Sequence, residues 1–506
     1  MNRIISKDID ENIRIIEELT KDCGDVVKRK FPIGKERSVY GFIIYIDVMI
    51  DRRVIEESIL EKLMVDVRGV DPEIKDSPFS VYDLIKDGGL ATADIKELIT
   101  IEEVMLAILS GDTVLLIDGF SKAIMIATKG FPNRGVQEPD TESVVRGSKD
   151  GFSEALRINT VLIRRRIRDT ALKIKQKQIG VRSKTDIALV YMEGIVKPEL
   201  LKEVEDRLAS FEIDAILESG TIEQLIEDKW TSPFPQIQST QRPDKVAASV
   251  LEGRVAIVVD NTPFVLIVPA PLNCFLQASE DYYQRWIVTC FVRIIRYISA
   301  IIALSLPGLY IALTSFHPEM IPTSLTLAIA ASREGVPFPA VFEILIMEIA
   351  FELLREAGIR LPKPIGSTIG IVGGLIIGQA AVEANIISPI IVIVVSLTAI
   401  SSFTIPSIAL TEGMRICKFL IIMSSAVLGL YGFILGELVI LIHLVSLKSF
   451  GTPYLTPYVG SEQNGGSDLK DSLIRMPLFM LNRRPMFSEK GNRTRLRIFR
   501  NKQKMK

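Results

Sequence analysis

Three glutamates recur with helical spacing inside an apolar part of the chain. Glu348, Glu352 and Glu356 are four residues apart, and Glu343 precedes them in the same segment. Ionisable side chains at membrane depth are costly, and they commonly face a cavity, a partner or an ion path. If several copies surround one axis, each glutamate repeats as a ring, and rings of acids attract cations. The pattern predicts a cation path; the alternative is a helix at the membrane surface whose acids are only solvated.

Other acids extend this hypothesis along the second half of the chain. Glu383 and Glu437 lie next to or within apolar runs, where a solvated surface role is less natural. The candidate ion path therefore has five members, which are Glu343, Glu348, Glu352, Glu383 and Glu437.

A ladder of glycines follows the acidic segment. Gly366, Gly370, Gly374 and Gly378 recur every four residues, so on a helix they form one smooth ridge. Small-residue ridges let helix backbones approach closely in lipid. We expect the ridge to pack helices either within one chain or between copies of a homo-oligomer.

The residues that most enzymes need are scarce. The only histidines are His317 and His443, and no phosphate-binding GxxxxGK[ST] loop, GxSxG elbow or HExxH motif is present. The four cysteines have no metal or disulfide spacing, and they are Cys23, Cys274, Cys290 and Cys417. The sequence predicts no catalytic site, no metal and no cofactor.

Composition divides the 506 residues into a soluble half, a membrane half and a basic tail. Mean hydropathy is +0.30, but the long apolar runs lie between residues 287 and 447. The charged, amphipathic start is not a signal peptide, so we expect a cytoplasmic N-terminal domain. The predicted parts are a helical extension (1–35), an α/β subdomain (36–130), a helical connector (131–183), a second α/β subdomain (184–280), a membrane domain (281–447) and a tail (448–506).

The soluble half contains an internal repeat. Residues 108–126 match 250–268 without a gap, each predicting two strands joined by a tight turn at Asp118-Gly119 or Asp260-Asn261. Upstream, residues 42–51 resemble 188–197, and a helical pattern follows both. The repeat predicts two α/β subdomains of similar topology. Between them, residues 143–177 are Arg-rich and predict a helix.

The membrane half predicts several spans. The aromatic and cationic group DYYQRW precedes a first apolar run over residues 287–316. Later apolar segments cover 365–383, 386–405 and 416–447, and the last is long enough for Gly429 to Gly432 to tilt or break it. The tail from residue 482 has ten Lys or Arg and one acid, which favours the cytoplasm and contact with anionic lipid. We therefore expect a polytopic α-helical domain with an even number of crossings, four to six. A net charge of -1 and the absence of nucleic-acid motifs argue against nucleic-acid binding.

Long blocks of the chain are similar to a known family. It resembles the A subunit of GerA-type germinant receptors of the endospore inner membrane over residues 36–460, with the related sporulation protein SpoVAF as an alternative. The blocks that carry this resemblance are residues 144–168, 218–257, 281–286, 336–364 and 378–389. The resemblance implies a soluble domain of two α/β subdomains on the spore-core side of the membrane.

The resemblance also implies partners and a function. Such A subunits work with a transporter-like B subunit, which is thought to hold the nutrient, and with a lipoprotein C subunit. The A subunit is thought to oligomerise into a cation channel that opens when nutrient binds. Two other functions stay open: an ion-coupled secondary transporter, and a membrane-anchored sensor or scaffold without a pore.

Overall fold

The chain folds into two compact units. The computed structural model describes residues 3–33, 39–64, 94–130, 138–139, 142–360, 378–459 and 467–497. The first unit comprises Met1–Glu227, Ile237–Pro269 and Asn482–Lys506, and the second comprises Asp228–Gln236 and Ala270–Leu481. The units are described separately below.

The first unit contains two antiparallel sheets of five strands each. The elements of the first sheet are α1 (Ile9–Leu19), β1 (Val26–Ile33), β2 (Val39–Ile46), η1 (Val54–Leu60), α2 (Glu61–Met64), β3 (Ile95–Leu98), α4 (Ile101–Leu109), β4 (Thr113–Ile117) and β5 (Ala123–Ile126). The elements of the second are α5 (Leu156–Arg164), β6 (Leu172–Ile179), β7 (Thr185–Met192), α6 (Pro198–Leu208), α7 (Ser219–Ile226), β8 (Gln238–Thr240), α8 (Pro243–Leu251), β9 (Val255–Val259) and β10 (Val265–Val268). The short helix η10 (Lys490–Asn492) also belongs to this unit.

The two sheets have the same strand order, so the predicted repeat is confirmed. The order is β1-β2-β4-β5-β3 in the first sheet and β6-β7-β9-β10-β8 in the second. The predicted hairpins are β4–β5 and β9–β10, and both turns contain a positive φ, at Gly119 and at Asn261. Glycine and asparagine tolerate this left-handed conformation better than other residues, which explains the Asp-Gly and Asp-Asn turns.

The structural repeat also includes the helix that precedes each sheet. The carboxylate of Asp118, in the first hairpin, accepts a hydrogen bond from the backbone N–H of Ile9, the first residue of α1. Asp260, its repeat partner, accepts the equivalent bond from Leu156, the first residue of α5. Each hairpin aspartate thus satisfies one of the N–H groups that a helix start leaves unpaired.

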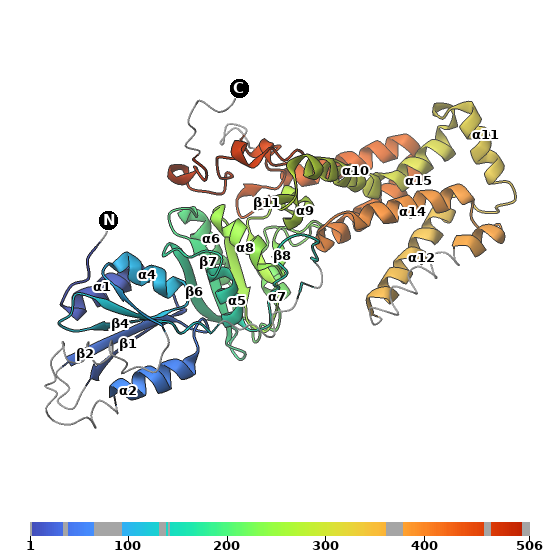
Figure 1. The fold of residues 1–506 in the computed structure, drawn as a ribbon. Coiled ribbons are helices and arrows are strands. Elements are labelled where there is room, and N and C mark those ends of the chain that lie inside the picture. Colours follow the sequence, from blue (N-terminus) through green and yellow to red (C-terminus); the bar gives the residue numbers. More distant parts are fainter. Residues whose placement is uncertain are drawn as a thin grey trace, which may run out of the picture. The chain divides into compact units, whose positions relative to one another are not determined.

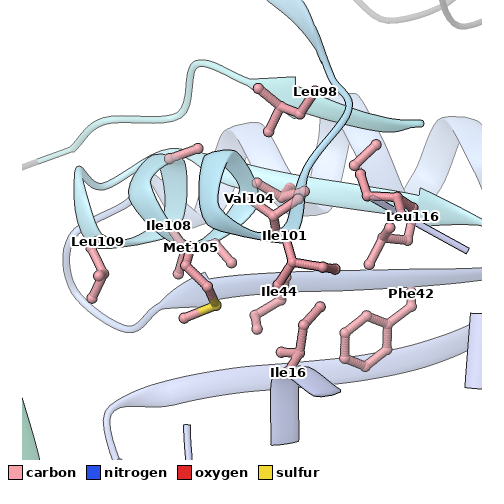
Figure 2. Packing of buried hydrophobic residues seen from close by; sticks show 14 of the residues in the cluster. Ile16, Phe42, Ile44, Leu98, Ile101, Val104, Met105, Ile108, Leu109 and Leu116 are labelled. Atoms are coloured by element: carbon pink, nitrogen blue, oxygen red, sulfur yellow. The ribbon is translucent and has the colours of Figure 1, made fainter. Parts of the chain in front are cut away.

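Both faces of the first sheet are covered. Alternate residues of β2 and β4, such as Phe42 and Leu116, pack with Ile16 of α1 and Met105 of α4 (Figure 2). The opposite side chains pack against η1 and α2, which lie across the sheet from α1 and α4 (Figure 1). Burial on both faces explains why β4 is apolar at nearly every position, without polar alternation.

Two strands contradict the sequence prediction. Residues 172–179 lie in the segment predicted as a helix over 143–177, but they form β6, and only Leu156–Arg164 of that segment is α-helical. Residues 26–33, assigned to a helical extension, form β1. Both are edge strands of their sheets and carry several lysines and arginines. Charged side chains protect a sheet edge against pairing with other chains, and here they hide the strand pattern.

The second unit is mainly helical. Its helices are α9 (Leu272–Leu276), η4 (Ser279–Tyr282), α10 (Trp286–Ile311), η5 (Ala312–Phe316), η6 (Pro318–Met320), α11 (Thr323–Ser332), α12 (Ala340–Arg360), α14 (Pro389–Phe403), α15 (Ile408–Ser446), η8 (Ser467–Lys470) and η9 (Leu478–Met480). A two-stranded ribbon, β11 (Lys448–Ser449) and β12 (Thr452–Pro453), follows α15. Within the described residues, two helical stretches are long and apolar enough to cross a membrane, Trp286–Phe316 and Ile408–Ser446.

The longest helix is folded back on itself, as the sequence suggested for this region. Gly429 in α15 has φ 59° and ψ -134°, which no α-helix contains. A Cβ on Gly436 would lie 3.5 Å from a side-chain carbon of Ile421, although 15 residues of straight helix would span about 22 Å. The α15 helix is therefore a hairpin of two antiparallel arms, residues 408–428 and 430–446.

The other membrane predictions have different outcomes. The segment 386–405 contains α14, whose 15 residues are shorter than the ~20 that a crossing needs. The glycine ridge lies mostly outside the described residues, since Gly366, Gly370 and Gly374 fall in the range 361–377. Gly378 is described, and a Cβ there would make an ordinary contact with Val392 at 3.5 Å.

Candidate functional site

The helices of the second unit run between two apolar clusters. One cluster joins Phe275, near the start of α10, with Ile405 and Leu447, which follow α14 and α15. The other joins Ile311, at the end of α10, with Ala340 at the start of α12 and Ile391 in α14. We call these the near cluster and the far cluster. The α10 helix runs from near to far, and α14 runs back.

The acidic helix α12 starts at the far cluster and runs toward the near one. Phe351 of α12 contacts Phe403 at the end of α14, and the centroids of the two rings are 6.2 Å apart. Glu343, Glu348 and Glu352 are thus distributed along the bundle from the far end to the near end. Each of the three has a cationic partner from another segment.

Glu348 is paired at the centre of this bundle. Its Oε2 accepts a hydrogen bond from Lys418 Nζ of α15 at 2.5 Å, and the two side chains are only 2% and 8% exposed. Two charges removed from water gain from each other only when they stay paired, so the lysine largely neutralises this acid. Glu348 Oε1 has no hydrogen-bond partner among the described residues.

Glu352, one turn later, pairs with the same helix. Arg415 Nη1 donates to Oε1 and Oε2 of Glu352 at 2.7 and 2.8 Å. Arg355, on the next turn of α12, lies 3.4 Å from the same carboxylate. The spacing of Glu348 and Glu352 on α12 matches the spacing of Lys418 and Arg415 on α15, so two ion pairs join the two helices side by side.

Glu343 is fully buried at the far end. Its Oε2 accepts the backbone N–H of Ser388 at 2.8 Å, just before the first residue of α14. Arg333 Nη2, after α11, lies 3.2 Å from Oε1. The carboxylate therefore links three segments, the end of α11, the start of α12 and the start of α14.

A small cavity adjoins the central ion pairs. Its volume is about 20 Å³, which is room for about one water molecule. Its polar lining includes Glu348, Glu352, Thr398, Arg415 and Lys418, while Ala303 and Phe351 are among its apolar walls. The cavity is too small to be a pore within one chain.

The remaining predicted acids lie apart from this network. Glu437 Oε1 accepts a hydrogen bond from the hydroxyl of Ser305 at 2.5 Å, which joins the second arm of α15 to α10. Glu383 is exposed, and its contact is the side-chain amide of Gln379 at 2.8 Å. Among the described residues no cation pairs with Glu383.

An ionic cluster that the sequence did not predict lies at the start of α10. Asp281 accepts hydrogen bonds from Arg293 and Arg296, and Arg293 also donates to Asp471 at 2.8 Å. Arg475 donates to the backbone oxygen of Asp281 at 2.7 Å. Asp281 thus connects the two arginines of α10, and Arg293 also binds the segment 471–475 directly. The sequence signal for this cluster was the pair Arg293 and Arg296, which lie about one helical turn apart in an apolar helix.

In the first unit one buried ion pair joins the two halves of the repeat. Arg164, the last residue of α5, donates from Nε and Nη2 to the two oxygens of Asp25 at 2.8 and 2.9 Å. The side chains are 1% and 2% exposed. Arg164 Nη1 also donates to the backbone oxygen of Leu172 at 3.2 Å. Among the described residues, no group of His, Cys, Asp and Glu is arranged to hold a metal.

The fold and these sites define a chain of two different units. One unit contains two antiparallel sheets, and the other contains two helical stretches long and apolar enough to cross a membrane, one of which is joined to α12 by ion pairs. The chain belongs to the GerA family, described as Bacillus/Clostridium GerA spore germination protein, which matches residues 14–487. The resemblance found in the sequence is thereby confirmed, and the family is one of germination receptor subunits, not a known enzyme family.

Two relatives and one solved structure are similar to this chain. Spore germination protein KA of Bacillus subtilis (strain 168) is 42% identical over 492 residues, which cover 97% of this chain and 89% of the relative. Stage V sporulation protein AF of the same organism is 33% identical over 438 residues, 86% of each chain. The crystal structure of the N-terminal domain of the A subunit of the Bacillus megaterium spore germinant receptor GerK3 covers 53% of this chain and 98% of its own, with 33% identity and a TM-score of 0.42.

Proposed function

We propose that this chain is the A subunit of a nutrient germinant receptor and that copies of it assemble into a nutrient-gated cation channel. Its partners are the transporter-like B subunit and the lipoprotein C subunit. It is a multi-pass protein of the spore inner membrane, its N-terminal domain lies on the core side, and its basic tail contacts anionic lipid. The greater identity to germination protein KA than to stage V sporulation protein AF favours a receptor subunit.

The observation that carries the channel proposal is a difference among the acids. Glu343, Glu348 and Glu352 are each matched by a cation inside the chain, so they hold helices together. Glu383 is exposed and has only an amide contact. An unneutralised acid repeated around an axis attracts cations, so we assign cation selectivity to Glu383. This removes Glu343, Glu348 and Glu352 from the five-member ion path. Of the two acids that remain, Glu383 is exposed, whereas Glu437 is half-buried and hydrogen-bonded to Ser305. The glycine ridge remains the proposed contact between copies.

The first test is the mass of the detergent-purified chain, corrected for bound detergent, followed by conductance in planar bilayers. We expect an oligomer of at least four copies and a preference for K⁺ over Cl⁻ that falls in the Glu383→Gln variant. The matched control is Glu356→Gln, because Glu356 is also exposed but is paired with Arg360. A monomer without conductance would contradict the channel and favour a transporter or a scaffold.

A further inference from the structure

A large cavity of the described chain lies in the first unit. Its volume is about 940 Å³ and it is open to solvent. Pockets of about 300–1,000 Å³ commonly hold small molecules. Nothing in the proposed channel function uses this cavity.

The walls of the cavity are apolar and come from two helices. The wall residues are Ile15 and Leu19 of α1, and Ile101, Met105, Leu106 and Leu109 of α4. Most of these side chains also belong to the core of the first sheet, so the wall is held rigidly (Figure 2). Leu106 is the exception, because 58% of it is exposed. A large leucine left in solvent beside a cavity is surface that an apolar ligand would bury.

The rim of the cavity is charged. It consists of Arg3 and Glu102, and of Arg168, Asp169 and Thr170, which follow α5. The segment after α5 is held in place because Arg164, four residues before Arg168, is anchored to Asp25. The rim is therefore built by both halves of the repeat.

The acids on the rim accept hydrogen bonds, whereas the guanidinium groups on the rim do not donate any to the described residues. Glu102 accepts the backbone N–H of Arg3 at 3.1 Å, and Asp169 accepts the backbone N–H of Ala171 at 2.9 Å. By contrast, the guanidinium groups of Arg3 and Arg168 make no ion pair or hydrogen bond with the described residues. Guanidinium groups match the geometry of carboxylates and phosphates, so the uncommitted rim charge selects an anion.

We propose that this cavity binds a small amphipathic anion, with an apolar body against α1 and α4 and a carboxylate at Arg3 and Arg168. The bound molecule would contact both halves of the soluble unit. The site is independent of the membrane acids, so its occupancy can be tested without a working channel.

The experiment is photolabelling of the full chain in nanodiscs of phosphatidylcholine, a lipid without net charge. The probe is octanoate with a diazirine near its tail, and adducts are mapped by mass spectrometry of peptides. We expect saturable labelling within residues 101–109, displaced by unlabelled octanoate and not by octyltrimethylammonium. Charge-assisted hydrogen bonds contribute enough that Arg168→Glu should weaken labelling by about tenfold or more.

Two variants separate the wall from the rim. Leu106→Glu should also weaken labelling, because it puts an acid on the apolar wall, and Leu106 is exposed enough that the fold tolerates the change. The controls are Leu217→Glu and Arg146→Glu, at exposed positions that do not line the cavity. Non-saturable labelling, equal displacement by the cationic competitor, or unchanged labelling in Arg168→Glu would each overturn the proposal.

Discussion

Removing the carboxylate of Asp25 should weaken the contact between the two halves of the repeat in the first unit. In the Asp25→Ala variant, Arg164 loses its carboxylate partner, keeps its contacts with the oxygen of Leu172 and the Cys23 thiol, and stays buried at 1% exposure. A buried charge that loses its partner costs about 3–5 kcal/mol, because the desolvation penalty remains while the attraction is gone. We expect this loss to appear as opening between α5 and the start of β1.

The assay is hydrogen exchange of the full chain, read by mass spectrometry. At about 1.4 kcal/mol per tenfold, a loss of 3 kcal/mol speeds exchange by at least about 100-fold for amides that exchange through this opening, such as those of β1 and β6. The control is Lys30→Ala, which removes an ion pair to Asp10 whose partners are 36% and 60% exposed. Exposed pairs contribute about 1 kcal/mol or less, so exchange should change by about fivefold at most.

A double variant distinguishes the charge from the shape of the site. Asp25→Leu with Arg164→Met replaces both charges by apolar groups of similar size, and such replacements of buried pairs are commonly neutral or stabilising. Exchange in Asp25→Ala no faster than in Lys30→Ala would refute the reasoning. It would mean that water reaches Arg164 despite its burial.

Three further predictions concern other sites. Glu348→Ala should lower the thermal midpoint of the detergent-purified chain because it strands buried Lys418, and adding Lys418→Met should recover most of the loss. Burial and the nearby negative charges of α7 raise the pKa of Glu223 to about 7. An acid whose pKa is higher in the folded state lowers the free energy of unfolding as pH rises from about 4.5 to 7. Glu223→Gln should therefore stabilise the first unit at pH 8 and have little effect at pH 5. Thermal unfolding at pH 5 and at pH 8 measures this difference. Gly432→Ala should destabilise the α15 hairpin in the same detergent assay, since its Cβ would overlap the Ser424 oxygen of the other arm, whereas Gly378→Ala meets only an ordinary contact. Equal midpoints for the two glycine variants would rule out the hairpin packing.

The fold could be predicted where local chemistry determines it. The turns at Asp118 and Asp260 fixed the two hairpins, because few dipeptides accept the positive φ that they require. The edge strands β1 and β6 were missed because only one face of each is apolar and lysines occupy the rest. Charged side chains protect a sheet edge against pairing with other chains, and they interrupt the continuous apolar run by which an inner strand such as β4 is identified.

The sequence pointed to the acids of α12 but not to the cations that pair with them. The acids of α12 were found from their spacing, yet their partners are 63 residues away for Glu352 and 70 for Glu348. No local pattern links such distant residues. A clue was present in the spacing, because Arg415 and Lys418 are three residues apart in an apolar helix and match two acids four residues apart in another.

The return of the chain to its first unit constrains any route through a bilayer. Ser488 forms an isolated β-bridge with Val196, and Arg484 donates a hydrogen bond to the backbone oxygen of Leu251. The guanidinium group of Arg254 lies over the ring of Phe487. The polypeptide that leaves this unit after Pro269 is therefore back in it by Asn482. A loop that begins and ends on one side of a barrier must cross it an even number of times. If the chain crosses a bilayer between Pro269 and Asn482, the number of crossings must therefore be even, whichever helices make them.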